Sequence, residues 1–300
     1  MPPRSTSLTP PSIHPPTPPE PRTPNPEPRT PNPEPMKLTF IGAGKMATAL
    51  AGGLVKGGVF AVDDVTATDV VAGARAAFTD STGIQTEAGN DTAIAVADVV
   101  ILAVKPQVAA EVLLPLHGAF DDKLFVSIAA GLSIEKLREW IGSDRVIRVM
   151  PNTPALVGQG AAVFACGDGV TADDRDLATR IFDAVGIVCE MDEDKLDAVT
   201  GLSGSGPAYV FEMIQAMVDG AVAAGLPADS ALDLTVQTVA GAAEMVRQKM
   251  GTPDELRTAV TSPGGTTAAG LEVMNDVDFR AIMTQVIARA TERSAELGAE

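Results

Sequence analysis

Histidine and cysteine are scarce in this 300-residue sequence, which contains two of each. His14 lies in a proline-rich N-terminal stretch, so His117 is the only histidine in the rest of the chain. A histidine-based catalytic triad and a metal site of several histidines are therefore excluded. Cys166 and Cys189 are too few for a disulfide framework or a metal cluster. The sequence predicts no metal site, and it indicates that any chemistry comes mostly from a bound cofactor.

Basic residues are also few, because 22 Lys and Arg stand against 39 Asp and Glu, for a net charge of −17. Residues 1–35 hold three Arg and three Glu, so the whole excess falls on residues 36–300. An acidic surface repels phosphate backbones and anionic lipid heads, so we expect neither nucleic acid nor membrane as partner. The sequence lacks an apolar run near the ~20 residues of a membrane span, and its N-terminal stretch lacks the apolar core of a secretory signal. We expect a soluble, cytoplasmic protein.

Proline is rare after residue 35, because fifteen of the 23 prolines lie in residues 1–35. This stretch repeats the seven residues of positions 19–25 at positions 26–32. It favours extended polyproline conformations and has almost no apolar side chains to bury. We therefore expect residues 1–35 to form a disordered tail. At ~100–200 residues per domain, the chain length suggests two domains.

A dinucleotide-binding pattern begins directly after the tail. Residues 36–41 have the apolar pattern of a strand, and residues 46–55 have the apolar spacing of a helix. Between them runs the sequence Gly42-Ala-Gly44-Lys-Met-Ala47. Gly42 permits a tight turn, Gly44 lets the backbone approach a pyrophosphate, and Ala47 lets helix and strand pack closely. The alternative is a glycine turn kept only for packing.

Strand and helix patterns alternate as far as residue 191, and only helix patterns follow. The alternation predicts a doubly wound α/β sheet with its ligand at the carboxyl ends of the strands. We expect a Rossmann-type dinucleotide-binding domain over residues 36–191 and an all-α domain over residues 192–300. The later strands are expected at residues 65–69, 98–105, 124–128, 145–150, 161–165 and 186–191. Helices are expected at residues 72–78, 90–97, 207–224, 228–250, 266–274 and 278–297.

Two turns rich in hydroxyl groups precede helices in the second domain, at residues 203–207 and 262–267. Each places backbone N–H groups at a helix start, which suits a small carboxylate. Each also fits an ordinary helix-capping loop, and the residues alone leave the two interpretations open. The helices at residues 208–249 are rich in Gly and Ala, and their smooth surfaces predict contact with a second subunit.

The chain resembles the pyrroline-5-carboxylate reductase family, which reduces a cyclic imine to L-proline with NAD(P)H. The resemblance covers essentially all of residues 36–300. It is carried by the motifs at residues 40–47, 103–106, 149–154, 197–209 and 261–267, of which the last two are long and specific. It implies a Rossmann domain followed by an all-α dimerisation domain, in helix-swapped homodimers that often join a larger ring. In that arrangement the active site combines one subunit's nucleotide domain with helical segments that include the partner's.

The resemblance also implies which residues form the site. Cofactor contacts are expected from Ile41, Gly42, Ala43, Gly44, Lys45, Met46, Asn90, Ala103, Val104, Lys105, Pro106, Ile128, Ala129 and Ala130. Substrate contacts are expected from Ser262, Gly264, Gly265, Thr266 and Thr267.

Thr267 is the expected catalytic residue, because its hydroxyl can hydrogen-bond the ring nitrogen of the imine. The N–H groups around Gly264 and Gly265 can hold the substrate carboxylate. The imine is basic enough to be protonated in solution, so the missing histidine is no obstacle. Lys105 is an alternative proton donor, although contact with cofactor phosphate or ribose is the preferred interpretation of this lysine.

Two other functions stay open. One is a β-hydroxyacid-type dehydrogenase of related architecture, and the other is a nucleotide-sensing scaffold without turnover. The dehydrogenases rely on a lysine in their helical domain, whereas Lys195 and Lys249 lie outside any matching motif. Oxidation of NAD(P)H in the presence of the cyclic imine, of hydroxyacids or of neither separates the three.

Asp69 is a further expected cofactor contact, because it lies 25 residues beyond Gly44, close to the ~20 of the dinucleotide pattern. A carboxylate there accepts hydrogen bonds from a free ribose 2′-OH and repels a 2′-phosphate. We therefore expect NADH to be used at least as well as NADPH, against the usual leaning of the family. Two alternatives remain: Asp69 only caps the helix beginning near Ala72, or Arg75 folds back to hold the 2′-phosphate.

A chain shortened to begin at Met36, where members of the family begin, is expected to keep full activity and almost the same melting temperature. The reason is that residues 1–35 have almost no apolar surface to contribute to a core. Steady-state kinetics and thermal unfolding of the two chains check this. A large loss of either property would show that the tail packs against the rest.

Overall fold

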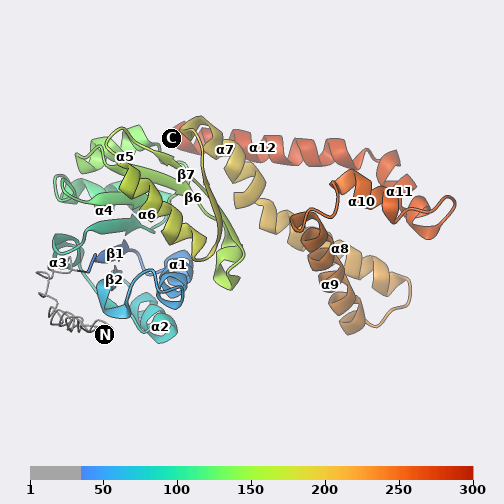
Figure 1. The fold of residues 1–300 in the computed structure, drawn as a ribbon, viewed down its shortest axis with the longest axis horizontal. Helices are drawn as coiled ribbons and strands as arrows, with labels where there is room; N and C mark the ends of the chain where they lie inside the picture. Colours follow the sequence, from blue (N-terminus) through green and yellow to red (C-terminus); the bar gives the residue numbers. More distant parts are fainter. Residues whose placement is uncertain (1–34, 300) are drawn as a thin grey trace, which may run out of the picture. The chain divides into compact units, whose positions relative to one another are not determined.

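The computed structural model describes residues 35–299, and the expected disordered tail lies outside them except for Pro35. The first part of the described chain forms one eight-stranded sheet in the order β3-β2-β1-β4-β5-β6-β7-β8 (Figure 1). The strands are β1 (Leu38–Ile41), β2 (Val65–Thr68), β3 (Gln85–Glu87), β4 (Val99–Leu102), β5 (Leu124–Ser127), β6 (Val146–Met150), β7 (Gly160–Cys166) and β8 (Gly186–Glu190).

Helices cover both faces of the sheet and enclose two apolar cores. One core takes side chains from α1 (Lys45–Lys56), α2 (Ala72–Thr82) and α6 (Ala172–Asp183). The other takes them from α3 (Asp91–Ala95), α4 (Pro106–Leu113), α5 (Ile134–Ile141) and α7 (Leu196–Val199). The expected doubly wound architecture is confirmed.

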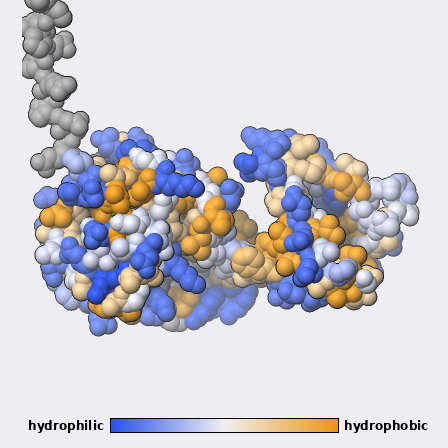
Figure 2. All heavy atoms as spheres, turned by 90° about the horizontal axis from the view of Figure 1, so that it is seen from below, coloured by the Kyte–Doolittle hydropathy of each residue, from blue (hydrophilic) through white to orange (hydrophobic). Residues whose placement is uncertain are grey.

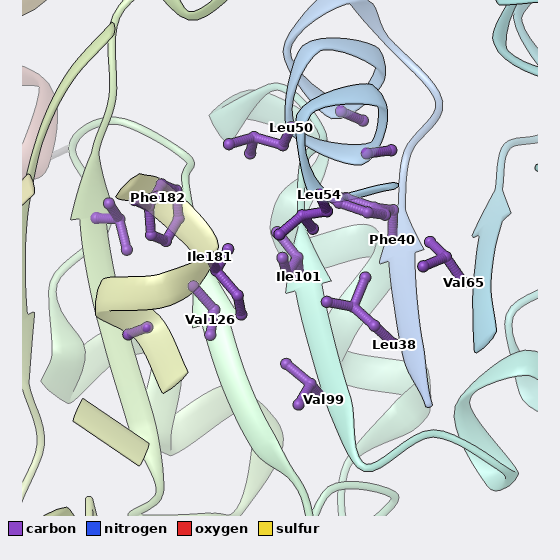
Figure 3. Close-up of a cluster of buried hydrophobic side chains, with 14 of the residues drawn as sticks. Leu38, Phe40, Leu50, Leu54, Val65, Val99, Ile101, Val126, Ile181 and Phe182 are labelled. Atoms are coloured by element: carbon purple, nitrogen blue, oxygen red, sulfur yellow. The ribbon is translucent and has the colours of Figure 1, made fainter. Parts of the chain in front are cut away.

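Strand β4 shows why its sequence is apolar without interruption. Val99 and Ile101 point into the first core, which Figure 3 draws, whereas Val100 and Leu102 point into the second. Successive side chains of a strand point to opposite faces, so a strand between two helical layers needs apolar residues at every position. All four side chains are at most 1% exposed.

Strand β7 departs from the parallel arrangement, because it runs antiparallel to β6, while every other neighbouring pair is parallel. Only residues 151–159 connect β6 to β7, and they contain one 3₁₀ turn, Thr153–Val157. A parallel crossover needs about a dozen or more residues, so this connection can only reverse the chain. Alternation of strand and helix patterns does not predict this reversal, and the short strand β3 was also not expected.

Only helices follow β8 in the described chain: the 3₁₀ turn η4 (Glu193–Lys195), α7, the π-helical segment η5 (Thr200–Gly204), α8 (Gly206–Ala223), α9 (Ala228–Arg247), α10 (Pro253–Ala259), α11 (Thr266–Asp276) and α12 (Phe279–Ala299). These helices bury few residues: α8 buries Val218, α9 buries Ala231 and Thr235, and α10 and α11 bury none. Many of their apolar side chains are exposed, and Figure 2 shows such side chains in orange over this part of the chain. Among the described residues, no helix is long and apolar enough to cross a membrane.

Asp174 is a buried carboxylate whose charge the fold needs. It is 2% exposed, and Arg145 donates to it twice, from Nε at 2.9 Å and from Nη2 at 2.6 Å. Thr171 adds a capping box at the start of α6. Burial alone would raise the pKa of Asp174, but the hydrogen bonds from Arg145 and Thr171 outweigh burial and hold the pKa below its ordinary value.

Replacing Asp174 by Asn is expected to lower the free energy of unfolding at pH 7 by about 3 kcal/mol, because it leaves Arg145 without its charged partner. A carboxyl whose pKa is lowered by folding stabilises the fold above its unfolded pKa of about 3.9 and loses this effect as the pH falls through the folded pKa. The difference between wild type and variant should therefore shrink below about pH 4. Denaturation series between pH 2 and 7 measure it, with Asp168→Asn as the exposed control. A difference that did not depend on pH would contradict the assignment.

Candidate dinucleotide site

The turn between β1 and α1 is fixed by contact with the turn after β4. Gly42 has φ +104°, and a Cβ at this position would lie 2.9 Å from the carbonyl oxygen of Ala103 and 3.0 Å from a methyl group of Val104. Its N–H donates to the carbonyl of Thr68 at the end of β2 (2.8 Å). Only glycine fits here, and the residue joins the ends of three neighbouring strands.

Gly44 lies at the N-cap of α1 and faces open space. No atom lies within 4 Å of the position of an added Cβ, and no described side chain caps the helix. Lys45 and Met46 begin the helix, and Gly44 and Lys45 are exposed. A helix start with accessible N–H groups and no acidic side chain in its first turn suits a pyrophosphate.

Asp69 joins the end of β2 to the glycine turn. Its Oδ2 accepts from the N–H of Ala43 (3.0 Å), and its Oδ1 accepts from the N–H of Val71 (2.8 Å). Val71 is the N-cap residue of α2, so the carboxylate bonds the cap residue itself as well as the neighbouring turn. Arg75 donates from Nη1 to the carbonyl oxygen of Asp69 (2.7 Å), so its guanidinium lies at the same strand end.

Asn90 lies beside these residues at the start of α3. The hydroxyl of Thr68, at the end of β2, donates to Oδ1 of Asn90 at 2.6 Å. The bond fixes the side chain of Asn90 from the strand that also ends in Asp69. The pairing of β1 with β2 therefore brings Asn90 close to the glycine turn, although the two are distant in sequence.

The turns after β4 and β5 complete the edge. The N–H of Ala103 donates to the carbonyl of Ile41 (2.8 Å), and the N–H of Ile128 donates to the carbonyl of Leu102 (3.0 Å). Lys105 and Ala130 are exposed, and Pro106 begins α4. All fifteen residues expected at the cofactor thus lie at or directly after the carboxyl ends of β2, β1, β4 and β5, apart from Asn90, which is bonded to the end of β2.

A cleft of about 660 Å³ opens at the β4 and β5 end of this edge. One wall comes from the turns and helices of the sheet domain, and the other comes from α12 and η5. Its lining residues include Pro106, Ala130, Leu132, Trp140, Thr200, Ser294 and Leu297. The cleft therefore adjoins the turns after β4 and β5, where the sequence analysis expects cofactor contacts.

The expected substrate residues Ser262, Gly264, Gly265, Thr266 and Thr267 lie together in the turn between α10 and α11. Gly264 has φ +69°, and the N–H of Gly265 donates to the carbonyl of Ser262 (3.0 Å). Gly265 is the N-cap of α11, and Thr266 and Thr267 are exposed in its first turn.

Within one chain, this turn and the dinucleotide edge are far apart. Near this turn, Asp254 of α10 forms an ion pair with Arg280 in the first part of α12. The other end of α12 meets the sheet domain, where Ser294 bonds Asp197 of α7. At 1.5 Å per residue, the 14 residues from Arg280 to Ser294 span about 21 Å. The structure therefore does not bring Thr267 to the cofactor residues of its own chain.

Asn152 is a buried residue to which the sequence analysis gave no role. Its Oδ1 accepts from the N–H of Ala161 in β7 (2.8 Å), and its Nδ2 donates to the carbonyl of Ser203 in η5 (3.1 Å). It therefore joins two of the motifs named above, at residues 149–154 and 197–209. In the sequence this residue is only an amide side chain between Pro151 and Pro154, and that spacing does not indicate a role for it.

Comparison with known proteins matches both halves of the chain to described families. The family described as "NADP oxidoreductase coenzyme F420-dependent" matches residues 37–131, and "Pyrroline-5-carboxylate reductase dimerisation" matches residues 193–297. A pyrroline-5-carboxylate reductase of Pisum sativum is 45% identical over 87% of this chain and 95% of its own length.

Two solved structures are similar over nearly their whole length. A pyrroline-5-carboxylate reductase from Coxiella burnetii has a TM-score of 0.82 at 34% identity and covers 87% of this chain and 98% of its own. A pyrroline carboxylate reductase from Plasmodium falciparum, solved with NADP bound, has a TM-score of 0.80 at 32% identity, covering 88% and 98%.

The sheet order and the glycine turn define a Rossmann-type, NAD(P)-dependent oxidoreductase with a helical C-terminal region. The identity over most of the chain then gives the family directly. The protein belongs to the pyrroline-5-carboxylate reductase family. The expected fold class, family and cofactor class are confirmed.

Gly42 and Gly44 should respond differently to alanine. Gly42→Ala places a Cβ against Ala103 at a positive φ, so we expect a loss of about 1–3 kcal/mol of stability. Gly44→Ala meets no protein atom and should melt like wild type, but its methyl group occupies the space of the pyrophosphate and should weaken dinucleotide binding about tenfold or more. Thermal unfolding and calorimetric titration with NADP⁺ check the pair. Equal effects on stability would contradict this account.

Proposed function

We propose that this protein reduces 1-pyrroline-5-carboxylate to L-proline with NAD(P)H, the last step of proline biosynthesis. The observation that carries the proposal is the continuous dinucleotide edge of β2, β1, β4 and β5, in a chain whose relatives, matched over nearly their whole length, are named for this reaction. The fit to the cofactor rests on the open N-cap at Gly44, where a pyrophosphate meets backbone N–H groups without displacing a side chain.

The bound reduced nicotinamide supplies the hydride, and the residues of the chain hold and orient the two reactants. The hydroxyl oxygen of Thr267 is proposed to accept a hydrogen bond from the N–H of the protonated ring nitrogen. The N–H groups of Gly264 and Gly265 are proposed to hold the carboxylate, with Ser262 and Thr266 beside them. Because the imine is protonated in solution, the site needs to orient a charged C=N bond rather than to supply a strong acid.

We infer that each active site contains residues of two subunits. The length of α12 supports this, since Arg280, near the helices that carry Thr267, and Ser294, near the sheet domain, lie about 21 Å apart along the helix. The exposed apolar residues of the helical region give a second reason, because Phe211 is 65% exposed and Leu234 is 59% exposed. A second copy of the chain would cover such side chains and bring its own turn of residues 262–267 to this edge.

The domains of the chain, its assembly and its cellular compartment are also part of the proposal. The dinucleotide domain is placed at residues 36–191 and the substrate-binding and dimerisation domain at residues 192–300, since the last strand ends at Glu190. The assembly is proposed to be a homodimer or a ring of such dimers. We place the protein in the cytoplasm without nucleic-acid or membrane partners, in line with its net charge of −17.

Oxidation of NADH and NADPH with the cyclic imine tests the function, with hydroxyacids as competing substrates. Thr267→Ala is expected to lower kcat with the imine by about 3- to 10-fold, the range of one lost hydrogen bond, and to leave cofactor affinity within a few-fold. Thr258→Ala is the matched control, because its hydroxyl bonds only the carbonyl of Asp254 in its own helix. Unchanged turnover in Thr267→Ala would remove this residue from the mechanism.

Asp69→Ser is expected to raise kcat/KM for NADPH relative to NADH by roughly tenfold, or about 1.4 kcal/mol, because it removes a charge that repels the 2′-phosphate. Wild type should use NADH at least as well as NADPH. Arg75→Ala serves as the opposite variant. Arg75 lies at the same strand end, so its loss should lower kcat/KM for NADPH and leave kcat/KM for NADH unchanged. A strong wild-type preference for NADPH, or a ratio that Asp69→Ser leaves unchanged, would contradict this role of Asp69.

A further inference from the structure

The last turns of α12 lie directly on the turn that follows β5. A Cβ added to Gly298 would lie 3.1 Å from the carbonyl oxygen of Gly131, and one added to Gly131 would lie 3.5 Å from the nitrogen of Gly298. Gly131 has φ +77° and directly follows Ala129 and Ala130. The two backbones are therefore in contact with no side chain between them.

A hydrogen bond holds this end of α12 in place. Ser294 is 5% exposed, and its hydroxyl donates to Oδ1 of Asp197 on α7 at 2.7 Å. Arg148 of β6 lies beneath, with Nη2 3.9 Å from the same carboxylate oxygen and Nη1 3.0 Å from Glu193. Glu193 also accepts from the N–H of Ile134 at the start of α5 (2.8 Å). A chain of polar contacts thus runs from the sheet through α7 to α12.

The position of these contacts relates them to one half of the cofactor. Asp69 lies at the end of β2, where the adenosine ribose of a dinucleotide is held, and the pyrophosphate belongs to the turn after β1. The other half must then extend over β4 and β5, toward Ala130 and the cleft. Ser294 and Leu297 form the opposite wall of that cleft.

We propose that Ser294 and Asp197 are positioning residues that set the nicotinamide half of the cofactor site. Their hydrogen bond holds α12 against the turn of residues 129–131, and that turn supports the nicotinamide half. The inference rests on the proposed function only for the binding of a dinucleotide. It does not require that the imine is the substrate.

The test separates the two halves of the cofactor by binding. Calorimetry measures the affinities of NAD⁺ and NADP⁺, which contain both halves, and of ADP and 2′,5′-ADP, which lack the nicotinamide half. Ser294→Ala is expected to weaken binding of the dinucleotide that wild type prefers by about five- to tenfold and to leave its fragment within about twofold. A defect of the whole fold would instead weaken both ligands alike.

Two control variants isolate the hydrogen bond. Asp197→Asn keeps an oxygen acceptor for Ser294, so it should weaken the dinucleotide less than Ser294→Ala does and spare the fragment. Ser81→Ala removes a hydroxyl that bonds only the carbonyl of Ala77 in its own helix, and it should change neither affinity.

A second variant reaches the same turn by a different route. Gly298→Ala leaves Ser294 and Asp197 intact but places a methyl group 3.1 Å from the Gly131 carbonyl, so it should also weaken the dinucleotide and spare the fragment. If Ser294→Ala and Gly298→Ala weaken both kinds of ligand equally, or neither, the positioning role is wrong. If the variants lose dinucleotide affinity selectively but the wild-type protein does not turn over the imine, the proposed substrate is wrong. The positioning role of Ser294 and Asp197 is then still supported.

Discussion

The distance that α12 imposes between its two ends is the constraint on which the rest of the structure depends. Near one end Arg280 forms an ion pair with Asp254 of α10, and near the other end Ser294 bonds Asp197 of α7. A helix does not shorten without losing its hydrogen bonds, so the turn of residues 262–267 stays away from the dinucleotide edge of its own chain. A second chain must therefore supply that turn if the two are to act on one substrate.

The exposed surface of the helical region fits this requirement energetically. Phe211, Leu234 and Val273 are each more than half exposed, and burying such a side chain fully contributes about 1.5–3 kcal/mol. A partner that covers several of them stabilises the helices and assembles the site in the same step. Activity and stability should then both depend on protein concentration, since association favours the folded state by mass action.

Much of the dinucleotide edge follows from the sequence, because its determinants are local. Gly42 and Gly44 follow a short apolar strand, and the uninterrupted apolar run of β4 requires a sheet covered on both faces. Other features depend on contacts between distant segments. The reversal at β7 follows from a connection too short for a crossover, and the bond of Asn152 to Ser203 joins residues that no spacing relates. Spacing places Asp69 near the glycine turn but does not predict its bond to the N–H of Ala43. The separation of Thr267 from the cofactor edge depends on the length and position of α12 in the fold, which the sequence pattern does not give.

Mixing two inactive chains tests the two-subunit site most directly. Gly44→Asp places a negative charge where the pyrophosphate lies but keeps an intact substrate turn, whereas Thr267→Trp keeps the cofactor edge and blocks the substrate turn with a large side chain. When the two are coexpressed in equal amounts, half of the dimers are mixed, and each mixed dimer holds one site with both parts intact. The account predicts that activity returns to about a quarter of the wild-type value, as expected for a symmetric dimer. Activity no greater than that of the two variants assayed separately would place the whole site within one chain and contradict the account.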